Sequence, residues 1–497
     1  MGGFSADAAG RSGGRARRKG GPPAALSRLP TEGLSRPIAR AAGRPQIDTS
    51  AGLNQDLVST NLGPNQRDLT LTGTVSLPLY AGGRVRNSVR AANTRVEAGR
   101  ADLRSTEGDI FTQAVSAYMD VIRDRMIVNL NENQVRVLET NLQATRDRFE
   151  VGDLTRTDVA QSEARLALAR SSLATAEGRL EASEENFTAV IGDEPGELQP
   201  PPQLPPLPGT PDQAVEIALA NNADLASIAA QARAAGFDVA VARGARLPTV
   251  SAVSTTRYIN DLGSNDPLGA PVGSSPNSTT STGVGLSLSL PIYQGGEASA
   301  RVRQAQAFRS QLIETAIATE RNVVSTTRAA FAVYQAAQEA IESNEIAVAA
   351  NQLALEGTRA EQTVGTRNVL DVLNAEQELL NSQVALVTAR RDAYVAGFQL
   401  LDVMGQAEAE DLNLEGGPLY NPVVYYERYS DSWSDWNDGP RVRPASTRTV
   451  DPNSNSPVTQ LPGARDPSVA PPPPGDAVRP TTATGQPAQS GVTEPRQ

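Results

Sequence analysis

The sequence predicts an α+β membrane protein made of two copies of one unit, in which a pair of amphipathic strands is associated with a pair of long helices. Three observations support this fold class. The chain repeats itself at a fixed offset, apolar and polar residues alternate in four short segments, and two very long stretches without proline show helical periodicity.

The internal repeat is carried by short motifs. The chain reads VSLPLYAGGRV around Pro78 and LSLPIYQGGEA around Pro291, an offset of 213 residues. The same offset carries Val151-Gly152 to Val364-Gly365 and Gly192 to Gly405. A register held over more than a hundred positions indicates two copies of one structural unit.

Composition excludes most chemistry. The chain of 497 residues has no Cys and no His, and its only Lys is Lys19. This removes a thiol nucleophile, a thiolate metal site, a His general base and a Gly-Lys phosphate loop. We therefore expect no enzyme, no cofactor and no bound metal. A net charge of −11, with acidic residues and Arg interspersed, argues against a nucleic-acid partner.

Four segments alternate between apolar and polar residues, the pattern of strands with two unlike faces. They run from Pro45 to about Leu57, from Leu69 to Leu79, from Pro248 to about Ile259 and from Val284 to Ile292. Their length and alternation are typical of membrane-spanning strands. Four strands cannot close, and an open edge in a bilayer leaves backbone groups unpaired. We therefore expect one closed barrel built from several chains.

Each strand pair ends at Leu-Pro-Leu/Ile-Tyr and Gly-Gly, and a long helix is predicted directly after it. Helices are expected at residues 84–150, 157–190, 212–243, 297–363 and 369–404. At 1.5 Å per residue the longest would measure about 100 Å, which suggests antiparallel coiled-coil packing. Their narrow apolar stripes and many Ala residues suit lateral packing into a ring.

These elements divide the chain into two repeats and less regular parts. The first repeat covers residues 44–194 and the second covers 212–406, with a Pro-rich linker at 195–211 between them. An irregular aromatic segment is expected at 407–439 and a disordered Pro-rich tail at 440–497. Residues 1–43 are expected to be irregular, because they show neither an export signal nor a counterpart of the 212–243 helix. The interpretation that covers both observations is that they are not the native start.

The motifs LPLYAGGRV and LPIYQGGEA, with VGDLTRTDVAQSEARL and VGTRNVLDVLNAEQELLNSQ after the long helices, resemble the TolC family of outer-membrane efflux and secretion ducts. The likeness covers residues 45–436. It implies a homotrimer in which each chain gives four strands to a twelve-stranded transmembrane barrel and its helices to a periplasmic α-barrel. It also implies contact with outer-membrane lipid, a periplasmic adaptor protein and an inner-membrane transporter.

The resemblance further implies a gate at the periplasmic helix ends, closed by polar links and rings of acidic residues. Matched one residue at a time, Arg367 takes the place of a gate arginine, and Thr157 and Asp158 those of its partners on the neighbouring helix pair. Asp371 matches an aspartate that would appear three times around the axis. Three carboxylates in a narrow pore repel one another and favour cations.

Two positions depart from the family pattern. Gln362 stands where family gates often have a tyrosine, and Asn374 where a second ring aspartate is common, so we expect a looser, less cation-selective constriction. A simpler interpretation makes Arg367 and Asp371 solvated charges at a helix turn. A further one makes Asp158 and Asp371 acidic residues that the dipole favours at a helix N-terminus, a role compatible with the gate.

The helix turns have a structural role and a candidate binding role. Gly permits a tight turn between antiparallel helices. In the family these tips also meet the adaptor, so Val151, Gly152, Val364 and Gly365 are candidate adaptor contacts.

The predicted function is a trimeric outer-membrane channel-tunnel that exports small molecules or proteins, as the exit duct of a tripartite efflux or type I secretion system. The alternative is a soluble coiled-coil scaffold without channel activity, which would be an elongated particle without heat-resistant β-structure. The inner-membrane partner selects the cargo, so the sequence does not separate drug export from protein secretion.

Overall fold

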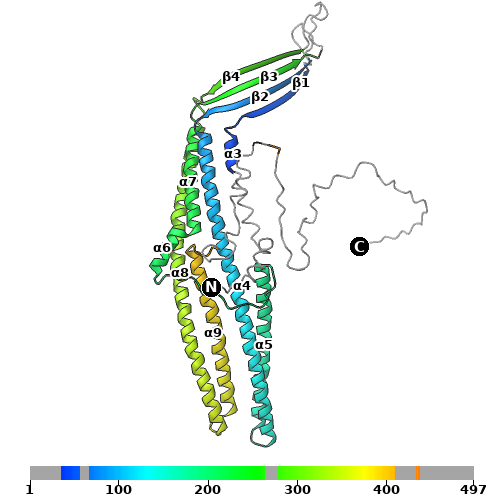
Figure 1. The fold of residues 1–497 in the computed structure, drawn as a ribbon, viewed down its shortest axis with the longest axis vertical. Coiled ribbons are helices and arrows are strands. Elements are labelled where there is room, and N and C mark those ends of the chain that lie inside the picture. Colours follow the sequence, from blue (N-terminus) through cyan, green and yellow to red (C-terminus); the bar gives the residue numbers. More distant parts are fainter. Residues whose placement is uncertain (1–34, 56–66, 263–277, 409–432, 434, 437–497) are drawn as a thin grey trace, which may run out of the picture.

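A computed structural model describes residues 35–55, 67–262, 278–408, 433, 435 and 436. In this part of the chain a four-stranded sheet lies at one end of an elongated molecule, and long helices extend from it to two hairpin tips at the other end (Figure 1). The predicted tail at 440–497, residues 1–34 and most of the aromatic segment lie outside the described residues.

The sheet consists of β1 (Gln46–Gln55), β2 (Arg67–Ala81), β3 (Thr249–Asn260) and β4 (Ser278–Ser289). The strands follow this order and all neighbours are antiparallel, so β1 and β4 form the two edges. One face carries apolar side chains such as Ile47 and Leu286, each 73% exposed. A sheet with an exposed apolar face and two open edges is not a complete unit in water.

The two strand hairpins have the same register. An offset of 203 residues for the first strand and 213 for the second carries the pair Gln46–Ser76 onto the pair Thr249–Ser289. The two offsets differ because the loop between β3 and β4 is longer than the loop between β1 and β2. The hairpins are therefore equivalent, and β1 stands to β2 as β3 stands to β4.

The strand predicted from Val284 to Ile292 both begins and ends earlier than expected, since β4 spans Ser278–Ser289. The equivalent stretch of β2 continues to Ala81 because it is paired with β3, for example at Tyr80–Val250. In the single chain β4 has no neighbour on that side, so the last residues of its alternating pattern lack the pairing that holds their counterparts extended.

Two helical hairpins form the long part of the molecule. The first joins α4 (Arg84–Glu150) to α5 (Arg156–Ile191), and the second joins α8 (Glu297–Thr363) to α9 (Val369–Val403). The bounds of α4 and α8 agree with the prediction at both ends. Each of the two begins after a glycine of positive φ, Gly83 at 72° and Gly296 at 87°, a conformation that glycine adopts without steric cost.

The prediction of one helix at 212–243 is wrong, because two helices occupy this stretch, α6 (Pro211–Asn221) and α7 (Ala223–Gly244). Asn222 separates them with a ψ of 125°. Its side chain accepts a hydrogen bond from the backbone N–H of Leu225 (3.0 Å) and donates one to the carbonyl of Val403 at the end of α9 (3.0 Å). The break is thus held by a tertiary contact that helical periodicity does not encode.

The expectation that residues 1–43 are irregular is also corrected, because Ser35–Ala41 form helix α3. This helix packs against α4, and a Cβ at Gly43 in the following turn would lie 2.9 Å from Val85 Cγ1. With the offset of 203, α3 corresponds to the last two turns of α7. A short counterpart of the second-repeat helix is therefore present.

The core lies between helices and not under the sheet. Its largest cluster is located where α6, α8 and α9 meet: Ala214, Ala218, Val323, Phe398, Leu400, Leu401, Met404 and Ala407. The Pro-rich linker is tied to α4 at this level, where the Tyr118 hydroxyl donates to the carbonyl of Gln199 (2.6 Å) and Arg125 donates to that of Gly196 (2.8 Å). The linker thus adds polar contacts to the apolar packing halfway along the helices.

We predict that Gly82→Ala lowers the thermal stability of the protein more than Gly83→Ala. Both glycines have positive φ, 62° and 72°, so each alanine brings about 1–3 kcal/mol of backbone strain. A Cβ at Gly82 would also overlap the carbonyl oxygen of Gly244, whereas at Gly83 the nearest atom is 3.7 Å away. Melting followed by circular dichroism in detergent measures the difference, and equal losses would contradict this account of the junction.

Candidate functional site at the helix tips

Both helical hairpins end in the same turn, at the end of the molecule opposite the sheet (Figure 1). Val151 and Val364 follow the last residues of α4 and α8, and Gly152 and Gly365 come next with φ of 82° and 79°. A Cβ at either glycine would meet nothing within 4 Å, so the positive φ alone requires glycine. The two valines are 80% and 74% exposed. Each tip thus presents one apolar side chain to its surroundings.

Asp158 lies in the first turn of α5, next to the exposed Thr157. Its carboxylate accepts hydrogen bonds from the backbone N–H and hydroxyl of Thr155 (2.9 and 2.7 Å), and its N–H donates to the Thr155 hydroxyl (3.3 Å). The hydrogen bond from the Thr155 side chain lowers the pKa of Asp158. Asp371 forms the same reciprocal cap at α9 with Asn368. Both aspartates therefore occupy helix N-termini, where a carboxylate is favoured.

Arg367 lies in the turn before α9. It donates to Glu361 (2.8 Å), and its guanidinium is 3.9 Å from the carboxylate of Asp371. The side-chain hydrogen bond to Glu361 raises the pKa of Arg367. The structure thus brings two of the predicted gate residues together on one hairpin. Thr157 and Asp158 lie in the first turn of α5, at the tip of the other hairpin. The tips of the two helical hairpins lie apart in the single chain (Figure 1).

A buried carboxylate above the tips joins the two helical hairpins. Glu376 of α9 is 3% exposed and accepts hydrogen bonds from Asn141 of α4 (3.0 and 3.1 Å) and from Arg359 of α8 (2.9 Å). Close to it, Arg165 of α5 donates to Asn374 of α9 (2.6 Å). These contacts fasten one hairpin to the other beside the candidate gate.

Sequence reasoning assigned no role to Glu376 and treated Asn374 only as a departure from a family pattern. The available signal was the repeated Arg–Glu pair, since the offset of 213 carries Arg146 and Glu163 onto Arg359 and Glu376. Arg146 and Glu163 are 2.6 Å apart in the first hairpin, but each side chain is about half exposed. In the second pair Glu376 is buried while Arg359 stays half exposed, and the burial of Glu376 depends on α4, which the pattern of one hairpin does not include.

A second group of ionisable residues lies at the other end of α9. Burial raises the pKa of Asp402 to about 6, and the nearby carboxylates of Asp109 and Asp224 add to this rise. A Cβ at Gly108 would overlap the Asp402 carboxylate, so α9 packs directly on the backbone of α4 there. Three helices thus bring carboxylates together in the middle of the molecule.

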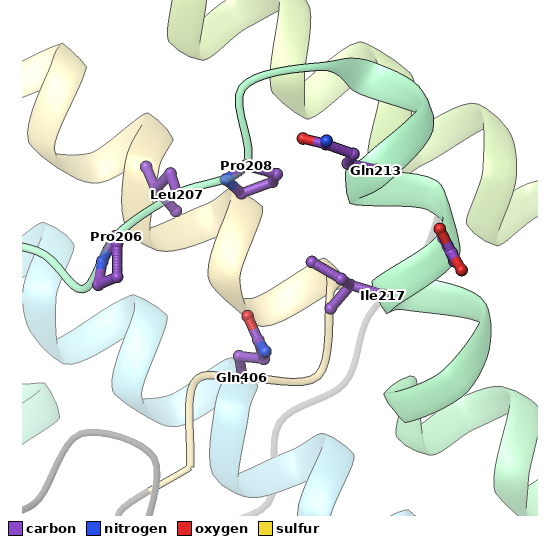
Figure 2. A pocket seen from close by; sticks show the side chains of 7 residues that line it. Pro206, Leu207, Pro208, Gln213, Ile217 and Gln406 are labelled. Carbon is purple, nitrogen blue, oxygen red and sulfur yellow. The ribbon is translucent and has the colours of Figure 1, made fainter.

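A shallow cavity of about 360 Å³ lies where the linker passes α6 and the end of α9 (Figure 2). It is lined by Pro206, Leu207, Pro208, Gln213, Glu216, Ile217 and Gln406. Glu216 is the one titratable residue among these, so the lining has no acid–base pair. Across the described ranges, no group of three or more His, Cys, Asp or Glu could hold a metal ion. None of the helices described has the length and apolar character of a membrane span.

Four amphipathic strands at one end and two helical hairpins of about 100 Å at the other define a class of outer-membrane channel proteins. The family model of outer membrane efflux proteins matches residues 35–193 and 214–406, and the chain belongs to this family. It is 34% identical over 400 residues to the outer membrane efflux protein BepC of Brucella suis biovar 1, covering 80% of this chain and 84% of that protein.

Two further relatives agree. The chain is 25% identical over 364 residues to the outer membrane protein TolC of Escherichia coli, covering 70% of this chain and 74% of that protein. The crystal structure of VceC from Vibrio cholerae has the same fold, with a TM-score of 0.65 at 21% identity over 77% of this chain and 92% of that chain. The protein is therefore a TolC-family efflux or secretion channel of the outer membrane that extends into the periplasm, in a family of channels and not of enzymes.

We predict that the protein loses stability as pH rises from about 5 to 7.5, and that Asp402→Asn removes much of this dependence. The pKa of Asp402 is about 6 in the folded protein and 3.8 for an ordinary aspartate. At pH values around and below 6 the folded protein therefore binds more protons than the unfolded one. Its stability therefore falls as pH rises through this range.

Melting temperatures at the two pH values measure this effect. Asp193→Asn, at an exposed position just after α5, controls for the loss of one negative charge. An Asp402→Asn variant that keeps the full slope would show that Asp402 does not cause it.

Proposed function

We propose that three copies of this chain form one closed channel-tunnel, the exit duct of a tripartite efflux or type I secretion system. The observation that carries the proposal is the pair of open edges, β1 and β4, in a sheet with an exposed apolar face. In a bilayer each unpaired backbone group costs several kcal/mol, so the edges must pair with other copies. Three chains of four strands make a twelve-stranded barrel, an even number within the range of outer-membrane barrels.

The equivalence of the two strand hairpins specifies how copies would pair. We assume that β4 of one copy pairs with β1 of the next in the register in which β2 pairs with β3. Adding 213 to Ser76 gives Ser289 and subtracting 203 from Val253 gives Ser50, so the pair Ser76–Val253 predicts the pair Ser289–Ser50 between copies. Residues 290–292 then gain the pairing that keeps residues 77–79 within β2. The same register accounts for the early end of β4 in a single chain.

Helix packing supports the same arrangement. Helix α7 packs against both α4 and α8, whereas its short counterpart α3 packs against α4. By equivalence, the side of α3 that corresponds to the α4-facing side of α7 would meet α8 of a neighbouring copy. That surface of α8 carries exposed apolar residues, including Phe308, Ile313 and Ile317 at 51%, 41% and 39%. Gly295 is the counterpart of Gly82 and also has a positive φ. A Cβ at Gly82 would meet the end of α7, whereas a Cβ at Gly295 would meet nothing within 4 Å, because no described helix of the same chain lies there.

The gate would lie between copies. Within one chain, the seam between the helical hairpins holds Asn141–Glu376 and Arg165–Asn374. At the seam between copies the offset places Ala354 at the position of Asn141 and Glu378 at that of Arg165. That seam lacks the buried bonds, so Arg367 of one copy and Thr157 and Asp158 of the next would be the polar groups available to hold it, with Asp371 forming a ring of three.

The same arrangement indicates which partners the chain would contact. The exposed Val151 and Val364, with the glycines beside them, are proposed contacts for a periplasmic adaptor protein that links the duct to an inner-membrane transporter. The apolar face of the sheet would contact outer-membrane lipid. Drug and protein cargo both remain compatible with these surfaces, since the transporter selects the cargo.

A disulfide experiment tests the trimer and its register. The chain has no Cys, so Ser50→Cys with Ser289→Cys introduces the only two thiols. Because directly opposed strand residues have Cβ atoms about 4.5–5.5 Å apart, we expect oxidation of outer membranes to give a covalent trimer on unreduced gels. Ser50→Cys with Ser287→Cys, two residues out of register, is the matched control. Cross-linking of the control alone would refute the register, and monomer from both variants would refute the closed barrel.

Conductance tests the gate. We expect Arg367→Ser to raise single-channel conductance in planar bilayers several-fold, because it removes the guanidinium that links the tips. Asp371→Asn should weaken block by divalent cations, because it neutralises a ring of carboxylates. Arg148→Ser removes an exposed arginine at the same level and should conduct like the original protein. Unchanged currents in both gate variants would show that these residues do not form the constriction.

A further inference from the structure

A basic groove of about 530 Å³ lies between the end of α3 and the first turns of α4. Four arginines line it with two valines, a glycine and a tryptophan: Arg40, Arg44, Arg86, Arg90, Val85, Val89, Gly43 and Trp433. No acidic residue is among these described lining residues. The close approach of Gly43 to Val85 brings the two basic segments together.

Aromatic rings hold two of the guanidinium groups in place. The guanidinium carbon of Arg44 lies 4.3 Å from the ring centroid of Trp433, and that of Arg90 lies 6.0 Å from the ring centroid of Phe237 on α7. Arg86 and Arg90 are four residues apart and share one face of α4. Several guanidinium groups with fixed planes suit the oxygens of a phosphate, which they bind in a bidentate manner.

The groove lies just beyond the sheet. Arg86 and Arg90 follow the last residue of β2, Ala81, by five and nine residues, so they lie within about 15 Å of the strand end. The polar zone of a bilayer extends roughly 5–8 Å beyond the hydrocarbon core on each side. With the sheet in the outer membrane, long arginine side chains at this level reach the headgroups of the periplasmic leaflet.

The second repeat has different chemistry at the same place. Arg40 and Arg90 correspond to Arg243 and Arg303, but Arg44 and Arg86 correspond to Leu247 and Ser299. Two of the four charges are therefore not needed to build the junction between strand and helix.

We propose that this groove binds the phosphate of an anionic phospholipid headgroup in the periplasmic leaflet of the outer membrane. The inference rests on the proposed placement of the sheet in the bilayer. The arginines bind the phosphate oxygens, Val85 and Val89 contact the glycerol and the first methylene groups, and Trp433 lies at the level where indole rings favour the interface. Bound lipid would then fasten α3 to α4 directly below the barrel.

The test uses the full chain, purified in detergent, stripped of lipid and offered phosphatidylglycerol or phosphatidylcholine under native mass spectrometry. Arg44→Leu with Arg86→Ser gives the first repeat the residues of the second, which that junction accommodates. We expect the original protein to prefer phosphatidylglycerol, and we expect this preference to fall about 25-fold in the variant, since each of the two arginines near an anionic surface contributes roughly fivefold. The matched control, Arg243→Gln with Arg303→Gln, removes two charges at the same depth and should keep the preference.

An unchanged preference in the Arg44→Leu/Arg86→Ser variant, or equal losses in both variants, would overturn the proposal. Inorganic phosphate at millimolar concentration should leave the bound lipid in place. Its displacement would assign the groove to soluble phosphate instead. Unheated gels and conductance are run on the same samples: a conducting trimer without lipid preference overturns only this inference, and absence of any trimer overturns the proposed function on which it rests.

Discussion

Backbone hydrogen bonding at the sheet edges is the constraint on which the rest of the structure depends. A bilayer offers no water to the N–H and C=O groups of β1 and β4, so these edges must meet other strands. The sheet then determines where the two long helices start, because Gly82-Gly83 turn the chain directly from β2 into α4 and Gly295-Gly296 precede α8 shortly after β4 ends at Ser289. In the proposed trimer, closure of the barrel would also bring the helical hairpins of neighbouring copies side by side.

The helices depend on lateral packing because their own core is thin. Many of the buried apolar residues between helices are alanines, such as Ala214 and Ala218, and large buried side chains such as Leu400, Leu401 and Met404 gather near the end of α9. Isolated clusters of this kind do not by themselves hold two hairpins of about 100 Å together. Polar ties supply the rest, from Arg391–Asp120 halfway along the molecule (2.8 Å) to Glu376 above the tips.

The sequence was sufficient where local chemistry determines structure. The bounds of α4 and α8 could be predicted because Gly-Gly marks their starts and a Val-Gly turn their ends, with no proline between. The sequence was insufficient where a contact with a distant part of the chain determines the local structure. The break at Asn222 depends on the end of α9, the extent of β4 on a missing neighbour, and the burial of Glu376 on α4. In each of these three cases the contact that decides the structure is made with a residue more than 150 positions away or with another chain.

The differences between the repeats carry more functional information than their similarity. A strictly duplicated chain would make two equal seams, one within each copy and one between copies. Here Asn141 and Arg165 strengthen the seam within the chain, while Ala354 and Glu378 stand at the equivalent positions. Opening a ring requires that some contacts yield before others. In the proposed trimer this inequality places the yielding contacts between copies, where Arg367 can exchange its own-hairpin partner Glu361 for a group on the neighbouring tip.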